Sequence, residues 1–321
     1  MISRIDTLDY CAYYNAYFGI IFKQALMKNL SLIIFSLFIT SLSGHALAKP
    51  QSDHPASITE LTITSEGHRM SGLIYGAAGR GLHPTILLLH GYPGNEKNLD
   101  VAQAMRSKGW NVVFFHYRGA WGSEGEFSFL NAEQDVQVVL DYLKTNAKKL
   151  NIDKQQISLV GHSMGGHMAI AGILNNPTVK CAVSYDGANL GANSASATNQ
   201  KKGGLLSDEK TAKMWLDYTE TLFMLNGWSA EKFKQEINNH SEKLDLVSRA
   251  SKINGRPVLL IAANTSVIPH DIHITPLLNA LKATKNSNIS YQLIEDDHSF
   301  SSSRDKLITV TANFLNAACK N

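Results

Sequence analysis

A serine at position 163 has the sequence surroundings of a catalytic nucleophile. It stands between glycines in the pentapeptide 161–165, Gly-His-Ser-Met-Gly. Apolar runs at 157–160 and 168–171 flank this pentapeptide and predict a strand, a sharp turn and a helix. Such a turn holds the serine in strained backbone geometry and exposes its hydroxyl at the helix N-terminus, where the helix dipole favours negative charge. We therefore predict that Ser163 is a nucleophile.

A nucleophilic serine needs a base, and His298 is in the best position to supply one. The chain has 12 histidines, so residue type alone selects none of them. His298 directly follows residues 289–297, whose first part reads as the last strand, and a helix follows it. In that place it would take the proton of Ser163 and return it to the leaving group. We expect His90, His162 and His167, which lie near the predicted site, to have structural roles.

Strands and helices alternate along most of the chain, which predicts a parallel sheet with helices on both faces. A hairpin is expected in residues 57–75, with its turn at Glu66-Gly67. The expected strands that follow are 84–90, 111–116, 156–161, 180–185, 257–262 and 289–294. The expected helices are 96–108, a helix from about 132 with Asn131 and Gln134 at its start, 164–175, and one after His298.

Residues 187–250 interrupt this alternation between the sixth and seventh strands. Residues 187–204 are rich in Gly, Ala, Ser and Asn and predict a loop, and helices are expected in 207–224 and 229–250. We interpret the insertion as a helical lid. Trp215, Tyr218 and Leu222 share one face of its first helix, which either packs the lid or lines a substrate pocket.

Four motifs resemble the α/β-hydrolase superfamily and, more narrowly, the bacterial dipeptidyl-aminopeptidase/acylaminoacyl-peptidase-like serine hydrolases. They are HGYPG at 90–94, FHYRGAWGSEG at 115–125, GHSMGG at 161–166 and DHSF at 297–300. The likeness covers roughly residues 57–318. It implies an α/β fold with a mostly parallel eight-stranded sheet, and a nucleophile that precedes the histidine in the chain.

The resemblance also implies an oxyanion hole and a reaction class. The backbone amides of Tyr92 and Met164 are expected to donate to the oxyanion, each contributing roughly 3 kcal/mol of transition-state stabilisation. The expected reaction is hydrolysis of an ester or amide (peptide) bond through an acyl-enzyme on Ser163. Members of this fold perform several reactions, so the resemblance is specific for the nucleophile and not for the substrate.

The chain departs from the family at the acid that orients the histidine. Relatives place an aspartate just after the seventh strand, but residues 262–269 contain no carboxylate. Asp186, at the end of the sixth strand, is our preferred replacement, and Asp271 is the alternative. Asn264 as a neutral orienting group, or no third residue at all, stays open. The missing acid also leaves open a catalytically impaired acyl-binding or scaffolding protein.

The N-terminal region has the pattern of a secretory signal. Residues 27–48 contain a short basic start, an apolar run from Leu30 to Leu42 and the cleavage pattern Ala46-Leu47-Ala48. We predict cleavage after Ala48, a periplasmic or secreted protein, and a hydrolase domain over residues 49–321. Residues 1–26 are expected to be an upstream extension. An uncleaved membrane anchor is the alternative.

Composition restricts the partners. The 30 Lys and Arg nearly balance the 27 Asp and Glu, so nothing favours nucleic acid or a charged membrane surface. We expect a small-molecule or short peptide substrate, no cofactor and no metal, because the sequence has no CxxC motif or histidine cluster. Cys181 and Cys319 could pair in an exported chain, but we favour two free thiols.

Overall fold

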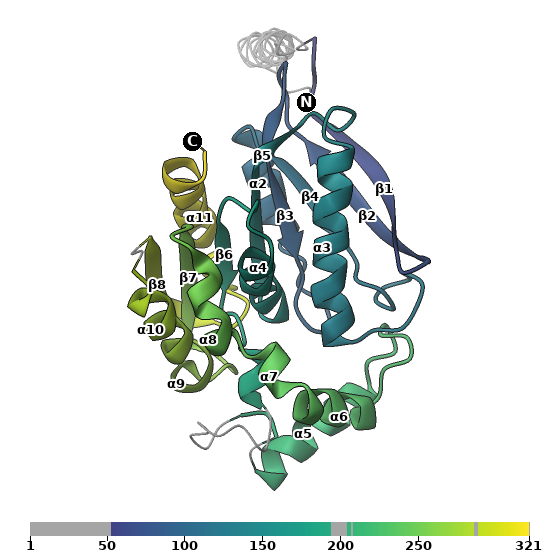
Figure 1. Ribbon diagram of the computed structural model, residues 1–321, viewed down its shortest axis with the longest axis vertical. Helices are drawn as coiled ribbons and strands as arrows, with labels where there is room; N and C mark the ends of the chain where they lie inside the picture. Colours follow the sequence, from purple (N-terminus) through teal and green to yellow (C-terminus); the bar gives the residue numbers. More distant parts are fainter. Residues whose placement is uncertain (1–52, 194–203, 207, 286–287, 321) are drawn as a thin grey trace, which may run out of the picture. The chain divides into compact units, whose positions relative to one another are not determined.

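One mixed eight-stranded sheet organises the chain, with strand order β1-β2-β4-β3-β5-β6-β7-β8 (Figure 1). The computed structural model describes residues 53–193, 204–206, 208–285 and 288–320, so the predicted signal at 27–48 lies outside the described residues. β1 pairs antiparallel with β2 and β2 antiparallel with β4, and the remaining neighbours are parallel. The strands are β1 Ser57–Ser65, β2 His68–Gly76, β3 His83–Leu89, β4 Asn111–Phe115, β5 Ile152–His162, β6 Ala182–Tyr185, β7 Val258–Thr265 and β8 Ile289–Asp297.

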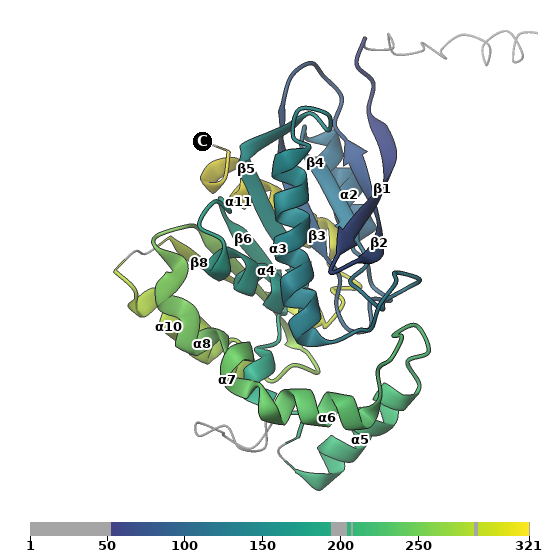
Figure 2. The same ribbon diagram turned by 45° about the vertical axis from the view of Figure 1, so that its right-hand side comes forward.

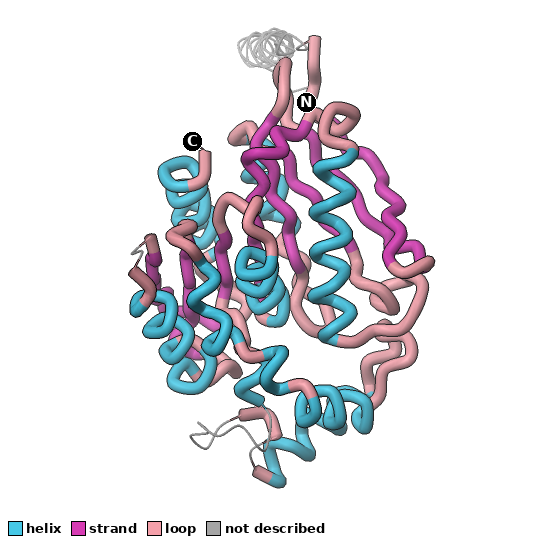
Figure 3. Tube along the Cα trace, in the orientation of Figure 1, coloured by secondary structure: helices cyan, strands magenta, loops and turns pink. Residues whose placement is uncertain are grey.

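Helices cover both faces of the sheet, as the alternation of strands and helices predicted (Figure 3). They are α2 Leu99–Ser107, α3 Phe129–Thr145, α4 Met164–Asn175, α9 His270–His273, α10 Thr275–Ala283 and α11 Arg304–Ala318. Two apolar clusters share the sheet: α2 and α11 pack into one, and α3, α4 and α10 into the other. The hairpin, the parallel strands and helix 164–175 lie where the sequence predicted them, although β5 begins earlier and β8 ends later.

The insertion between β6 and β7 is helical, as predicted, and is more fragmented than expected. It contains η1 Leu190–Asn193, α5 Glu209–Glu220, α6 Ala230–Asn239, α7 Ser241–Leu244, α8 Leu246–Arg249 and η2 Ala250–Ile253. In Figure 2 the helices α5, α6 and α7 lie beyond one end of the sheet. The stretch 229–250, expected to be helical, contains several short helices. α6 ends at Asn239, and Asp245 ends α7 and caps α8, accepting hydrogen bonds from the N–H groups of Val247 and Ser248.

Helix α3 begins three residues before its predicted start. Its N-cap is Ser128, whose Oγ accepts a hydrogen bond from the Asn131 N–H, so the predicted capping by Asn131 and Gln134 was wrong. The physical reason lies in the insertion, because the Glu236 carboxylate on α6 accepts the N–H groups of Phe129 and Leu130. The Ser128 cap is a local signal that the prediction missed, whereas the contribution of Glu236, 107 residues from Phe129, has no local sequence signal.

The prediction of two free thiols was also wrong. Cys181, directly before β6, and Cys319, at the end of α11, form a disulfide with a Cα–Cα distance of 5.9 Å. Both side chains are buried, and they are 138 residues apart in the chain. We expected free thiols because a buried cysteine is usually inert. Here the two buried sulfurs are instead bonded to each other. No helix in the described part of the chain is long and apolar enough to cross a membrane.

Removing the disulfide should destabilise the protein without changing its fold. We expect the double variant Cys181→Ser, Cys319→Ser to lose roughly 2–5 kcal/mol of unfolding free energy. The disulfide closes a long loop, so removing it gives the unfolded chain more conformational entropy. Urea unfolding of the two proteins measures the difference. Peptide mapping without reductant should recover the two cysteine peptides linked, and alkylation of both thiols in the unreduced protein would contradict the pairing.

Candidate active site

Ser163 occupies a strained turn between β5 and α4. Its backbone angles are φ 58° and ψ −120°, a conformation that non-glycine residues rarely adopt. Glycine is required on both sides, because a Cβ on Gly161 would overlap the carbonyl oxygen of Gly165, and one on Gly165 would overlap that of Leu89. The turn therefore matches the predicted geometry and leaves Ser163 partly exposed at the start of α4.

Backbone hydrogen bonds fix this turn to the next strand. The Ser163 N–H donates to the carbonyl oxygen of Tyr185 at 2.9 Å, and the Ser163 carbonyl accepts from Ala188 at 3.3 Å. Tyr185 ends β6 and Ala188 lies just beyond it. The position of Ser163 is therefore set relative to the residues that follow β6, and Asp186 is one of these.

Asp186 is fully buried and contacts His298. Its Oδ2 lies 2.6 Å from His298 Nδ1, and its Oδ1 accepts a hydrogen bond from the Ala263 N–H at 3.1 Å. The hydroxyl of Ser266 also donates to Oδ2. Because a buried carboxylate is stable only when it is paired and hydrogen-bonded, these contacts hold Asp186 in one orientation.

The structure brings neither of the other two candidates to His298. Asp271 lies on α9 with an exposed side chain. Asn264 is also exposed, and its side-chain oxygen accepts a hydrogen bond from the Asp296 N–H at 2.9 Å. Of the three residues considered as partners of the histidine, Asp186 is therefore the one in contact with it.

His162, which we expected to be structural, holds the backbone of His298. Its Nε2 lies 2.7 Å from the His298 carbonyl oxygen and must donate to it, and the two ring centroids are 4.6 Å apart. Burial, together with the nearby His298, lowers the pKa of His162 to about 4. A neutral His162 thus positions His298 without placing a second positive charge beside it.

The turn after His298 is fixed by further polar contacts. The Asp297 carboxylate accepts hydrogen bonds from the N–H groups of Ser299 at 2.9 Å and Ser301 at 3.0 Å. Arg304 donates to the Ser299 carbonyl oxygen at 2.8 Å and forms an ion pair with Asp100 on α2. These contacts attach the histidine loop to both α11 and α2.

The predicted oxyanion residues flank the nucleophile. A Cβ on Gly91 would lie 3.1 Å from the Cβ of Ser163, so the segment that contains Tyr92 passes directly beside the serine. Met164 is the first residue of α4, and its N–H has no acceptor within that helix. The two predicted donors therefore belong to segments that adjoin Ser163.

Two polar residues near Asp186 were not identified from the sequence. Ser266 follows β7, in the segment 262–269 that contains no carboxylate. His270, the first residue of α9, has its Nε2 3.5 Å from Asp186 Oδ1. A polar residue just after β7 was the one available signal for Ser266, whereas His270 depends on the path of the chain after Pro269.

The other two histidines near the site are structural, as expected. His167 is fully buried, and its Nε2 lies 2.8 Å from a carboxylate oxygen of Glu133. The same carboxylate accepts hydrogen bonds from the two terminal guanidinium nitrogens of Arg249. Burial alone would raise the pKa of Glu133, but the hydrogen bonds from His167 and Arg249 outweigh it and hold that pKa at about 2. Burial lowers the pKa of His90 to about 3, and its Nδ1 lies 2.9 Å from the Gly91 carbonyl oxygen.

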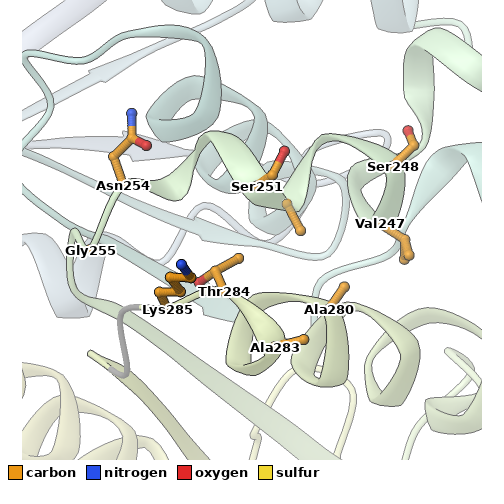
Figure 4. A pocket seen from close by; sticks show the side chains of 10 residues that line it. Val247, Ser248, Ser251, Asn254, Gly255, Ala280, Ala283, Thr284 and Lys285 are labelled. Carbon is orange, nitrogen blue, oxygen red and sulfur yellow. The ribbon is translucent and has the colours of Figure 1, made fainter.

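The described residues around this site form no metal-ligand cluster, and one described groove lies elsewhere. Over the described ranges, no group of three or more His, Cys, Asp or Glu could hold a metal ion. A groove of about 580 Å³ lies between η2, α8 and α10, and the predicted site residues are not part of its lining (Figure 4). Its lining residues are Val247, Ser248, Ala250, Ser251, Asn254, Gly255, Ala280, Ala283, Thr284 and Lys285.

Comparisons with known proteins match the central part of the chain and its fold. The BD-FAE family model matches residues 74–202. An uncharacterized 31.7 kDa protein of Escherichia coli is 33% identical over 104 residues, which are 32% of this chain and 36% of that protein. The aligned stretch therefore spans little more than a third of the length of that curated relative.

Two solved structures cover most of the chain at low identity. A Pyrococcus furiosus esterase aligns with a TM-score of 0.63 and 18% identity over 82% of this chain and 92% of its own. A Pyrococcus horikoshii acylaminoacyl peptidase aligns with a TM-score of 0.60 and 18% identity, covering 83% of this chain and 42% of its own. With the sheet order and the turn at Ser163, these matches confirm the predicted resemblance: the chain has the fold of the α/β-hydrolase superfamily.

Proposed function

We propose that this protein is a serine hydrolase that cleaves an ester or amide bond through an acyl-enzyme on Ser163. The observation that carries the proposal is the 2.6 Å contact between the buried Asp186 carboxylate and Nδ1 of His298. A carboxylate that accepts a hydrogen bond from Nδ1 keeps the proton on that nitrogen and leaves Nε2 free to act as a base. The strained turn at Ser163 supports the proposal independently.

The reaction follows from these positions. His298 Nε2 accepts the hydroxyl proton as Ser163 Oγ attacks the substrate carbonyl, and Asp186 stabilises the imidazolium that forms. The N–H groups of Tyr92 and Met164 donate to the oxyanion of the tetrahedral intermediate. His298 then protonates the leaving group, and a water molecule activated by the same histidine hydrolyses the acyl-enzyme. The reaction uses no cofactor.

The proposal includes both ester and amide bonds, because the same arrangement of groups can cleave either. The solved structures with this fold include an esterase and an acylaminoacyl peptidase, which supports testing both bond types. We expect small molecules or short peptides as substrates. Activity on p-nitrophenyl esters compared with activity on matched p-nitroanilides separates esterase from peptidase activity.

We also propose that the protein is exported. The basic start, apolar run and Ala-x-Ala pattern of residues 27–48 support it, and so does the Cys181–Cys319 disulfide, because disulfides persist mainly in oxidising compartments.

Export predicts a specific mature N-terminus. Mass spectrometry of the protein from the periplasm or medium should find Lys49 as its first residue, because cleavage follows the small residue Ala48. Recovery of the chain starting at Met1 or Met27, in a membrane or cytoplasmic fraction, would contradict export with cleavage.

Ser163→Ala should abolish hydrolysis and labelling by a fluorophosphonate probe. Loss of a serine nucleophile lowers kcat by about six orders of magnitude, because the acyl-enzyme cannot form. Ser266→Ala is a useful comparison, since it removes a hydroxyl from the same site and leaves Ser163 in place. Probe labelling and ester hydrolysis that survive in Ser163→Ala would assign the chemistry to another residue. A wild-type protein that never labels would instead favour an acyl-binding or scaffolding protein.

Asp186→Asn should lower kcat on the order of 10⁴-fold, because an amide cannot hold His298 in the required tautomer. Asp271→Asn, the matched control, should change kcat less than twofold, since its side chain is exposed and is not the carboxylate in contact with His298. Steady-state kinetics on one p-nitrophenyl ester measures both. Equal rates for wild type and Asp186→Asn would show that the site works without this carboxylate and would refute its assignment.

A further inference from the structure

A half-buried hydrogen-bond chain joins Tyr92 to the helical insertion. The indole N–H of Trp228 donates to the Tyr92 hydroxyl oxygen at 2.9 Å, and that hydroxyl lies 2.9 Å from Thr219 Oγ1. Thr219 in turn donates to the carbonyl oxygen of Trp215 at 2.8 Å. The direction of every bond is fixed, because an indole N–H can only donate and Thr219 has already used its proton. Tyr92 must therefore donate to Thr219.

The surroundings of Tyr92 keep this chain intact. Its ring packs against Phe127, Phe129 and Phe233, with centroids 5.5–6.1 Å away. Burial raises the pKa of Tyr92 above its usual range, so the phenol stays protonated at physiological pH. Losing either partner would leave this half-buried hydroxyl with one of its two hydrogen bonds unmade, which is costly in such surroundings.

A second set of contacts joins the same two segments. Trp121 donates through its indole N–H to the Pro93 carbonyl oxygen at 2.8 Å, and through its backbone N–H to the Met224 carbonyl oxygen at 2.9 Å. The backbone N–H of the insertion residue Asn226 donates to the carbonyl oxygen of Gly119 at 2.6 Å. Hydrogen bonds thus connect three segments: the stretch between α5 and α6, the loop after β4 and the segment 90–94.

We propose that Thr219 and Trp228 are positioning residues for the oxyanion hole. Through the Tyr92 hydroxyl they fix the ring of that residue, and with it the peptide group whose N–H would donate to the oxyanion. This inference rests on the proposed function and extends it: the insertion contributes to the rate of the chemical step. An oxyanion donor is effective only when it is held in place before the reaction.

Thr219→Val tests the inference, because it keeps the shape of the side chain and removes the acceptor for Tyr92. We expect kcat for p-nitrophenyl acetate to fall roughly 10- to 100-fold, the range for a displaced catalytic donor, while KM changes less than twofold. Thr219→Ser, which restores the hydroxyl, should return kcat to within threefold of wild type. Trp228→Phe keeps an aromatic ring, removes the donor and should lower kcat in the same direction.

Thr221→Val is the matched control. Thr221 belongs to the same insertion and is exposed, and its hydroxyl donates to the Tyr218 carbonyl oxygen at 2.7 Å and takes no part in the chain from Trp228 to Thr219. We expect its kcat and KM to equal those of wild type. Circular dichroism and melting temperatures of all variants show whether each is folded at the assay temperature.

Three results would overturn the inference. Thr219→Val could melt earlier yet keep its kcat, which would make the contact purely structural. It could raise KM at constant kcat, which would assign the residue to substrate binding. Thr219→Val could also match wild type in fluorophosphonate labelling rate, in which case this inference fails and the proposed function stands. A wild type that does not label at Ser163 would remove the proposed function itself.

Discussion

The buried charge of Asp186 is the constraint on which the rest of the site depends. A carboxylate without solvent access is costly unless charged or polar partners surround it. Its hydrogen bonds come from the backbone of β7, from Ser266 after β7 and from His298 after β8, while His270 on α9 approaches the other oxygen. These donors are far apart in the sequence, so satisfying one carboxylate fixes the relative positions of the segments that follow three strands.

The order of the sheet makes this convergence possible. Ser163, Asp186, Ser266 and His298 follow β5, β6, β7 and β8, which are neighbours in that order and run parallel. The carboxyl ends of such strands meet at one edge, so residues with no local relationship become close neighbours. Moving the acid from the end of β7 to the end of β6 shifts it by one strand, and the Ser266 hydroxyl then contacts it from the position relatives use for their own acid.

Local patterns predicted the parts of the structure that depend on local physics. The turn at Ser163 was predictable because adjacent glycines and flanking apolar runs define it, and the strands because apolar runs alternate with helices. The acid stayed ambiguous because Asp186 and His298 are 112 residues apart and no local signal links them. The disulfide was predicted wrongly for the same reason, because Cys181 depends on the distant Cys319. The start of α3 depends partly on the distant Glu236, but its N-cap Ser128 was a local signal that the prediction missed.

The buried histidines add no positive charge near Asp186 and His298. Burial lowers the pKa of both His162 and His273 to about 4, so both are neutral at physiological pH. His162 can therefore hold the His298 backbone by a hydrogen bond without competing for the negative charge of Asp186. In the proposed mechanism the carboxylate then stabilises chiefly the charge that appears on His298 during the reaction. Tyr92 resembles His162 in this respect. Burial keeps its phenol neutral, so its hydroxyl can hold the ring by hydrogen bonds without adding a charge.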